Sequence, residues 1–266
     1  MASTRDLPHG RAAARPALVA WSTPFAVAAT GLGTTVAVAA LVRLLPFGAP
    51  TAVAVLGAYG VLSAVVLARF GDDAEPGAGS FGLANAVTLA RGALNALLLG
   101  LLVDPAALDA VGGDAASWLV VAVALSSLSL DGVDGWVARR CRTASAFGAR
   151  FDVQVDALLL IVLALAAVVT GQAGLWVFAL AAGYYGFLAA RTVWPWLARP
   201  LPPSRARKGV FVAQATTLVV ICAPPVTTAV AAALTAATLA LMAVSFGRDV
   251  RWLWRRAAAS TGARAR

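Results

Sequence analysis

Four aspartates, Asp131, Asp134, Asp152 and Asp156, are the residues whose type and spacing could support chemistry. The first two are three residues apart and the last two are four apart, so on helices each pair would share one face. An ionised Asp at the centre of a membrane helix costs roughly 2.5–3.5 kcal/mol, and four in apolar surroundings therefore need compensation. Carboxylates that converge without nitrogen or sulfur ligands favour hard divalent ions such as Mg²⁺ or Mn²⁺.

Two glycines near these carboxylates favour a binding site over a solvated loop. Gly135 follows the first pair directly, and Gly148 lies four residues before Asp152. A glycine on such a face lets a helix or a ligand approach closely. The competing interpretation is a solvated loop in which neighbouring arginines neutralise the aspartates. It accounts well for one aspartate pair but not for four aspartates and two glycines in fixed register.

The composition of the 266-residue chain restricts its class, because 61% of the residues are hydrophobic and only 12% are charged. This is about half the charged share of a soluble domain, and it excludes a disordered chain, a coiled coil and an ordinary water-soluble enzyme. Chemistry that depends on a histidine base or a histidine-rich zinc site is excluded as well, because His9 is the only histidine.

Continuous apolar stretches predict an all-α integral membrane protein with about eight transmembrane helices. The last stretch is too long for one span, and we expect it to fold back at Pro224 and Pro225. The expected stretches are 17–42, 47–68, about 84–103, about 115–137, about 148–170, about 173–194 and 209–247, the last forming two spans.

A polar, Gly-rich segment indicates how the chain is divided. Residues 1–70 form an N-terminal tail and an extra helix pair, and 71–83 form the linker. Residues 84–250 form a six-helix core, and 251–266 form a basic tail. The helix pair is given no role beyond packing or contacts in a homodimer.

The basic excess predicts an orientation in the membrane. There are 21 basic and 12 acidic residues, a net charge of +9. With the N-terminus inside, Arg43 is the only basic residue expected in an outer loop, which satisfies the positive-inside rule. We therefore expect a multi-pass protein of the plasma membrane with both termini and the aspartates facing the cytoplasm. The excess then needs no nucleic-acid partner.

At this point the aspartates form part of a longer pattern. With the residues between them they resemble the signature of the CDP-alcohol phosphotransferase (CDP-alcohol phosphatidyltransferase) family, over about residues 84–250. An upstream element, Asn85, Thr88 and Arg91, resembles the opening of that family's first core helix. The matching signature positions are Asp131, Asp134, Gly135, Ala138, Arg139, Gly148, Asp152 and Asp156.

The resemblance implies a reaction and a role for each matching residue. Family members transfer a phosphate-linked group from a CDP-linked donor, usually CDP-diacylglycerol, to an alcohol in phospholipid synthesis, and release CMP. Four carboxylates would hold two Mg²⁺ or Mn²⁺ ions, and Asp156 matches the base that takes the acceptor's proton. The donor site would comprise Gly135, Ala138 and Gly148 at the cytidine end, Arg139 at a phosphate, and Asn85, Thr88 and Arg91 on the other wall.

The acceptor is less well defined, because Val153 and Ala157 stand where family members making phosphatidylglycerol phosphate or cardiolipin tend to have Pro and Lys. Clustered cations favour an anionic acceptor, such as a phosphorylated polyol. Arg191 has a competing interpretation as an interfacial arginine that reaches toward water. The candidate acceptor-binding residues are Arg150, Arg191, Arg205, Arg207 and Lys208.

Two other classes of membrane protein fit the sequence less well than this family. Mg²⁺-dependent membrane prenyltransferases also use aspartate pairs, but their motifs lie on the order of a hundred residues apart, whereas Asp134 and Asp152 are 18 apart. A divalent-cation transporter would place intramembrane aspartates on its permeation path. Such aspartates should lie near the membrane midplane, whereas these are expected at the inner ends of their spans. A transporter also leaves Arg139 and Gly148 unexplained.

Overall fold

The computed structural model describes residues 23–72, 81–141, 146–202 and 204–264. Within them the chain is all-helical, which confirms the predicted fold class in its coarse form. The elements are α1 (Thr23–Leu44), α2 (Ala49–Asp72), α3 (Gly82–Leu102), α4 (Pro105–Val111), α5 (Gly113–Cys141), α6 (Ala146–Val169), η1 (Leu175–Val177), α7 (Phe178–Val193), η2 (Pro195–Ala198), α8 (Arg205–Ile221) and α9 (Thr228–Arg264).

Six of the described helices are long and apolar enough to cross a membrane, namely α1, α2, α3, α5, α6 and α9. The predicted count of eight is therefore not confirmed. Helix α7 has 16 residues and α8 has 17, about 24 and 26 Å at 1.5 Å per residue, short of the roughly 30 Å hydrocarbon core. The 3₁₀ turn η1 stands where α7 would otherwise have its first turn. Charged residues occupy the first turn of α8, so its apolar part is shorter still.

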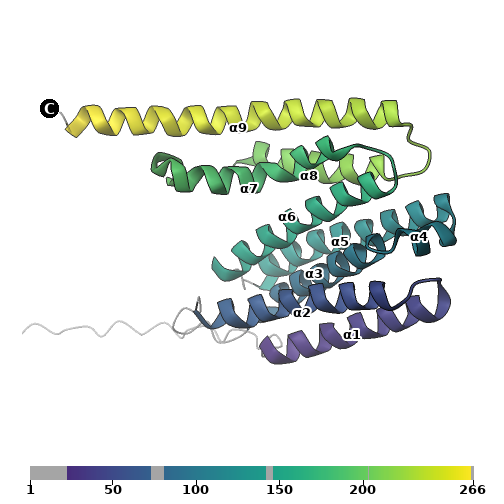
Figure 1. Cartoon of the computed structure of the whole chain (residues 1–266). Helices are drawn as coiled ribbons and strands as arrows, with labels where there is room; N and C mark the ends of the chain where they lie inside the picture. Colours follow the sequence, from purple (N-terminus) through teal and green to yellow (C-terminus); the bar gives the residue numbers. More distant parts are fainter. Residues whose placement is uncertain (1–22, 73–80, 142–145, 203, 265–266) are drawn as a thin grey trace, which may run out of the picture.

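Successive long helices run in alternating directions, so the molecule has two ends (Figure 1). At one end lie the start of α1, the end of α5, the start of α6, the start of α8 and the end of α9. At the other lie α4 and the α8–α9 connection. We name the first the basic end, because every described basic residue except Arg43 and Arg91 lies near it.

Helix α3 lies at the centre of the N-terminal half and packs on α1, α2, α5 and α6. Its glycines permit the close approach of α2. A Cβ added at Gly92 would overlap the side chain of Leu62, and one at Gly100 would overlap Val55 and come within 3.1 Å of the Thr51 carbonyl oxygen. A larger residue at Gly100 would push the two helices apart, whereas one at Gly92 requires the Leu62 side chain to move.

Helix α4 was not predicted, although its signals are present in the sequence. The Asp104 carboxylate accepts a hydrogen bond from the Ala107 amide at 3.1 Å, and Pro105 occupies the first turn, as is typical of helix starts. Gly112, with φ of 101°, ends the helix. The expected reversal at Pro224 and Pro225 is present between α8 and α9.

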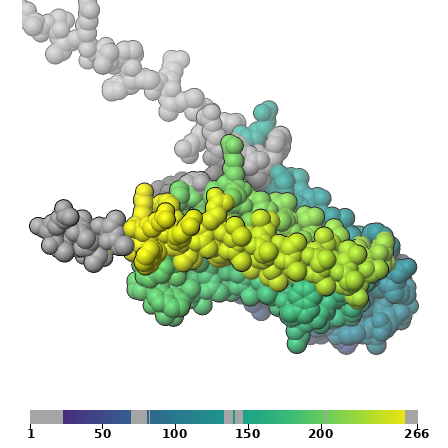
Figure 2. Space-filling view, turned by 90° about the horizontal axis from the view of Figure 1, so that it is seen from above, coloured from purple at the N-terminus to yellow at the C-terminus, as the bar shows by residue number. Residues whose placement is uncertain are grey.

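Helix α9 runs along one face of the molecule with its outer side open (Figure 2). Only 17% of its most apolar stretch is buried inside the protein. Exposed apolar side chains, including Leu241 and Val244, suit contact with lipid. The helix continues to Arg264, so the described part of the basic tail extends α9.

Candidate active site

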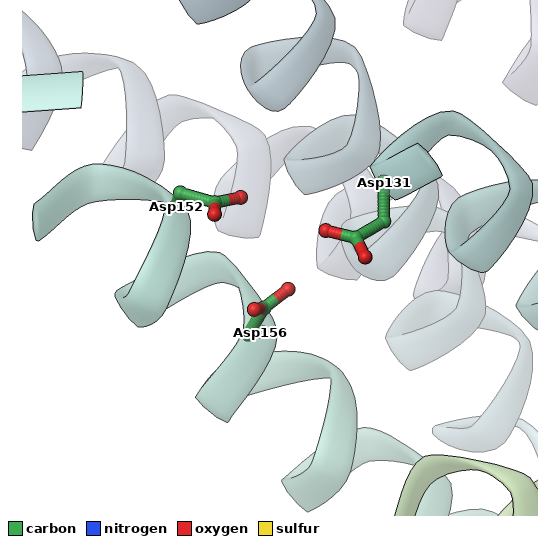
Figure 3. A group of neighbouring side chains, drawn as sticks. All are labelled: Asp131, Asp152 and Asp156. Carbon is green, nitrogen blue, oxygen red and sulfur yellow. The ribbon is translucent and has the colours of Figure 1, made fainter. Parts of the chain in front are cut away.

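Three of the four predicted aspartates come together near the basic end (Figure 3). Asp131 lies on α5, and Asp152 and Asp156 lie on α6, with their carboxylates directed toward one another. One oxygen from each carboxylate lies within 4.8 Å of the others. Side-chain exposure is 36% for Asp131, 38% for Asp152 and 17% for Asp156, so the cluster is partly buried but accessible.

The buried face of α6 explains the direction of its two carboxylates. Phe147, Phe151 and Val155 recur every four residues and pack into the protein. The rings of Phe147 and Phe151 stack with centroids 5.8 Å apart. Each aspartate follows one of these buried residues, and one residue is about 100° around a helix. The carboxylates therefore lie at the edge of the buried face.

The guanidinium of Arg91, on α3, lies against all three carboxylates. Its Nη1 is 3.0 Å from Asp131 Oδ1 and donates to Asp152 Oδ1 at 2.6 Å, while Nη2 donates to Asp156 Oδ1. The Arg91 side chain has no exposed surface. Although Arg91 is predicted to line the donor pocket, the structure brings its charge to the carboxylates.

A second buried polar group lies one turn further along α3. The Asn95 side chain donates to the Val155 carbonyl oxygen at 3.1 Å, and its Oδ1 accepts a hydrogen bond from the Ser127 hydroxyl at 2.9 Å. These bonds join α3 to both helices that carry the aspartates. Asn95 is absent from the predicted set, although an Asn in an apolar span, four residues after Arg91 and on the same face, is itself a signal.

A cavity of about 600 Å³ opens beside the cluster, with walls from α5, α6, α7, α8 and α9. All three carboxylates line it. Much of the remaining surface is apolar and includes Leu180, Phe187, Phe211 and Phe246. The cavity therefore joins a charged region at the aspartates to an apolar interior.

Two of the predicted acceptor cations line this cavity, Arg207 and Lys208 at the start of α8. Arg207 Nη1 lies 3.2 Å from both carboxylate oxygens of Asp249 on α9, and Nη2 donates to the Pro202 carbonyl oxygen. Lys208 is exposed and forms no ion pair with any described residue. Asp249 was not predicted, although it is the only acidic residue after Asp156.

Other predicted residues with described side chains do not line the cavity. Asn85 and Thr88 are buried on α3, and Gly148 lies on the first turn of α6. The three exposed cations, Arg150, Arg191 and Arg205, lie near the basic end.

Arg191 and four of the predicted residues on α5 remain to be placed. Arg191 directs Nη2 to the Ala198 carbonyl oxygen at 3.3 Å, a contact with its own connecting segment. The side chains of four predicted residues on α5 lie outside those that the structure describes, namely Asp134, Gly135, Ala138 and Arg139.

The chemistry of the cluster fits a divalent metal ion. Its three donors are all carboxylate oxygens from two helices, close enough together to bind one ion. Hard ions such as Mg²⁺ prefer this ligand type. The six apolar helices suggest an integral membrane protein, and its carboxylate cluster beside the cavity could hold a metal ion.

Comparison with known proteins defines the family. The sequence model of the CDP-alcohol phosphatidyltransferase family matches residues 81–244, more than half of the chain. The chain therefore belongs to this family, as its motif predicts, and the family's members are metal-dependent transferases of substituted phosphate groups. No match was found among curated proteins or among solved structures.

Proposed function

We propose that this protein transfers a phosphatidyl group from CDP-diacylglycerol to the hydroxyl of an alcohol, with release of CMP, in phospholipid synthesis. The observation that supports this most strongly is the aspartate cluster at a cavity that is also lined by Arg207 and Lys208. The carboxylates suit a metal-bound diphosphate, and the cations suit an anionic group of a substrate.

Asp156 is the proposed general base. It lines the cavity and is the least exposed of the three carboxylates. The acceptor's hydroxyl oxygen forms a bond to the phosphorus of the phosphatidyl group, and the bond from that phosphorus to the CMP oxygen breaks. CMP leaves with the bonding electron pair, and the hydroxyl proton passes to the Asp156 carboxylate.

We assign the metal site to Asp131, Asp134, Asp152 and Asp156, with two ions of Mg²⁺ or Mn²⁺. Bound there, the ions supply charge neutralisation for the donor diphosphate and for the departing CMP phosphate. The protein's own contribution is to gather the carboxylates from two helices, which the pairing of α3 with α5 and α6 supports.

The donor site is proposed to extend from the cluster to residues of α3, the end of α5 and the start of α6. Its assignment rests on the family motif, with the cytidine end at the small residues and one phosphate at the arginine. The residues assigned to it are Asn85, Thr88, Arg91, Gly135, Ala138, Arg139 and Gly148.

For the acceptor we propose a phosphorylated polyol. Lys208 and Arg207 are the favoured contacts for its phosphate, because both line the cavity. An arginine fork matches phosphate oxygens in pairs, and a lysine acts as a point charge. Arg150, Arg191 and Arg205 are secondary candidates, since none of them lines the cavity.

The proposed setting is the plasma membrane, with the basic end in the cytoplasm. The described basic residues gather at that end, whereas Asp104, Asp109 and Asp114 lie at the other. This asymmetry follows the positive-inside rule. Residues 84–250 are the proposed catalytic core, and 1–70 an accessory tail and helix pair.

The test uses the purified full-length chain in lipid nanodiscs with CDP-diacylglycerol, Mg²⁺ and a panel of alcohols. CMP and lipid product are followed together. Formation of both with a phosphorylated polyol supports the proposal, and formation of both only with neutral alcohols overturns the choice of acceptor. No CMP with any alcohol overturns the reaction, since neither a cation transporter nor a prenyltransferase would release CMP.

A further inference from the structure

Arg91 is the only charged side chain that is fully buried in the part of the chain that the structure describes. A buried charge is strongly unfavourable unless it is paired. Arg91 pairs with three described carboxylates, through Nη1 to Asp131 and Asp152 and through Nη2 to Asp156. Arg91 is not among the residues that line the cavity.

These contacts coincide with the ligand set of the metal site. Three carboxylates with oxygens within 4.8 Å of one another repel each other when ionised, more strongly in protein than in water. The guanidinium offsets part of that repulsion, and the four groups carry a net charge of −2. Divalent cations bound at the proposed site would offset the negative charge that remains on these three carboxylates.

We propose that Arg91 is a positioning residue that acts as the resident counter-charge of the metal site. It keeps the carboxylates of α5 and α6 gathered when no metal is bound, and its charge lowers the affinity of the site for divalent ions. The inference rests on the proposed metal site. It adds that metal affinity is set by a buried cation on α3 as well as by the ligands.

The test measures metal binding and stability without turnover. Full-length wild type, Arg91→Gln and Arg91→Lys are purified, stripped with chelator and titrated with Mn²⁺. Free Mn²⁺ is followed by electron paramagnetic resonance, and Tm is measured with and without the ion. Arg207→Gln is the matched control, because it removes another Arg–Asp ion pair near the basic end that does not involve the cluster.

The proposal predicts that Arg91→Gln lowers the Tm of the metal-free protein, binds Mn²⁺ at least threefold more tightly and gains more Tm from the ion than wild type. Arg91→Lys keeps the charge and should restore part of the metal-free Tm. Arg207→Gln should leave Mn²⁺ affinity unchanged. If Arg91→Gln cannot be isolated, Arg91→Lys carries the test, with an intermediate metal-free Tm.

Two results distinguish the failures. Equal or weaker Mn²⁺ binding by a folded Arg91→Gln protein overturns the role of Arg91. If only Arg91→Lys can be isolated, a metal-free Tm equal to that of wild type overturns it, because a lysine lacks the fork that pairs with several carboxylates at once. Absence of Mn²⁺ binding in wild type overturns the proposed metal site itself.

Discussion

Replacing Asp156 with Asn tests the proposed base with a minimal structural change. Asn has the same shape, and its side-chain oxygen can still accept the hydrogen bond that Arg91 Nη2 gives to Asp156, so the fold should persist. The amide cannot take the acceptor's proton. General-base catalysis contributes about 10²–10⁴-fold, which corresponds to about 2.7–5.5 kcal/mol of barrier at 1.36 kcal/mol per tenfold.

The assay is initial-rate CMP release at saturating CDP-diacylglycerol, together with donor binding measured separately. We expect kcat to fall at least 100-fold and donor affinity to change less. Asp249→Asn is the matched control, because Asp249 also lines the cavity but pairs with Arg207. It should mainly raise the KM for acceptor. Near wild-type kcat for Asp156→Asn would refute the assignment.

Three further results are expected. CMP formation should vanish in EDTA and return with Mg²⁺ or Mn²⁺, and full activity in chelator would contradict the metal site. Lys208→Ala should raise the acceptor KM several-fold with little effect on the donor KM. Arg191→Ala should raise the acceptor KM less, since Arg191 does not line the cavity; equal effects of both variants would count against the acceptor site. Asn95→Leu should lower the free energy of unfolding by about 1–3 kcal/mol, because it leaves a buried partner such as the Val155 carbonyl unpaired. The change is measured as a lower Tm in detergent, and an unchanged Tm would show that the hydrogen bonds of Asn95 contribute little to stability.

The sequence was sufficient for the family, whose motif is a matter of local spacing. The predicted convergence of the aspartates is observed for Asp131, Asp152 and Asp156, whereas the side chain of Asp134 lies outside those that the structure describes. Asp152 and Asp156 share a helix face by their separation, and the glycines and arginines in register with them specify one motif. Apolar stretches of membrane-spanning length likewise predict helices without knowledge of their packing.

Local spacing and periodicity do not predict contacts between segments that are distant in the sequence. The pairing of Arg207 with Asp249 joins residues 42 positions apart, and no periodicity indicates it. The pairing of Arg91 with the carboxylates depends on how α3 packs against α5 and α6, and the motif does not specify that packing. The apolar lengths of α7 and α8 depend on where the 3₁₀ turn and the charged first turn fall, so the number of spans could not be read from hydrophobicity alone.

The most direct test of the central claim is the stoichiometry of CMP and phosphatidyl product. Purified protein in nanodiscs, given CDP-diacylglycerol, Mg²⁺ and a phosphorylated polyol, is sampled over time and both products are quantified by mass spectrometry, with Asp152→Asn as the inactive control. Phosphatidyl transfer predicts one phosphatidyl-polyol phosphate per CMP, and neither product from the control. CMP accompanied only by phosphatidic acid, or no CMP at all, would contradict it.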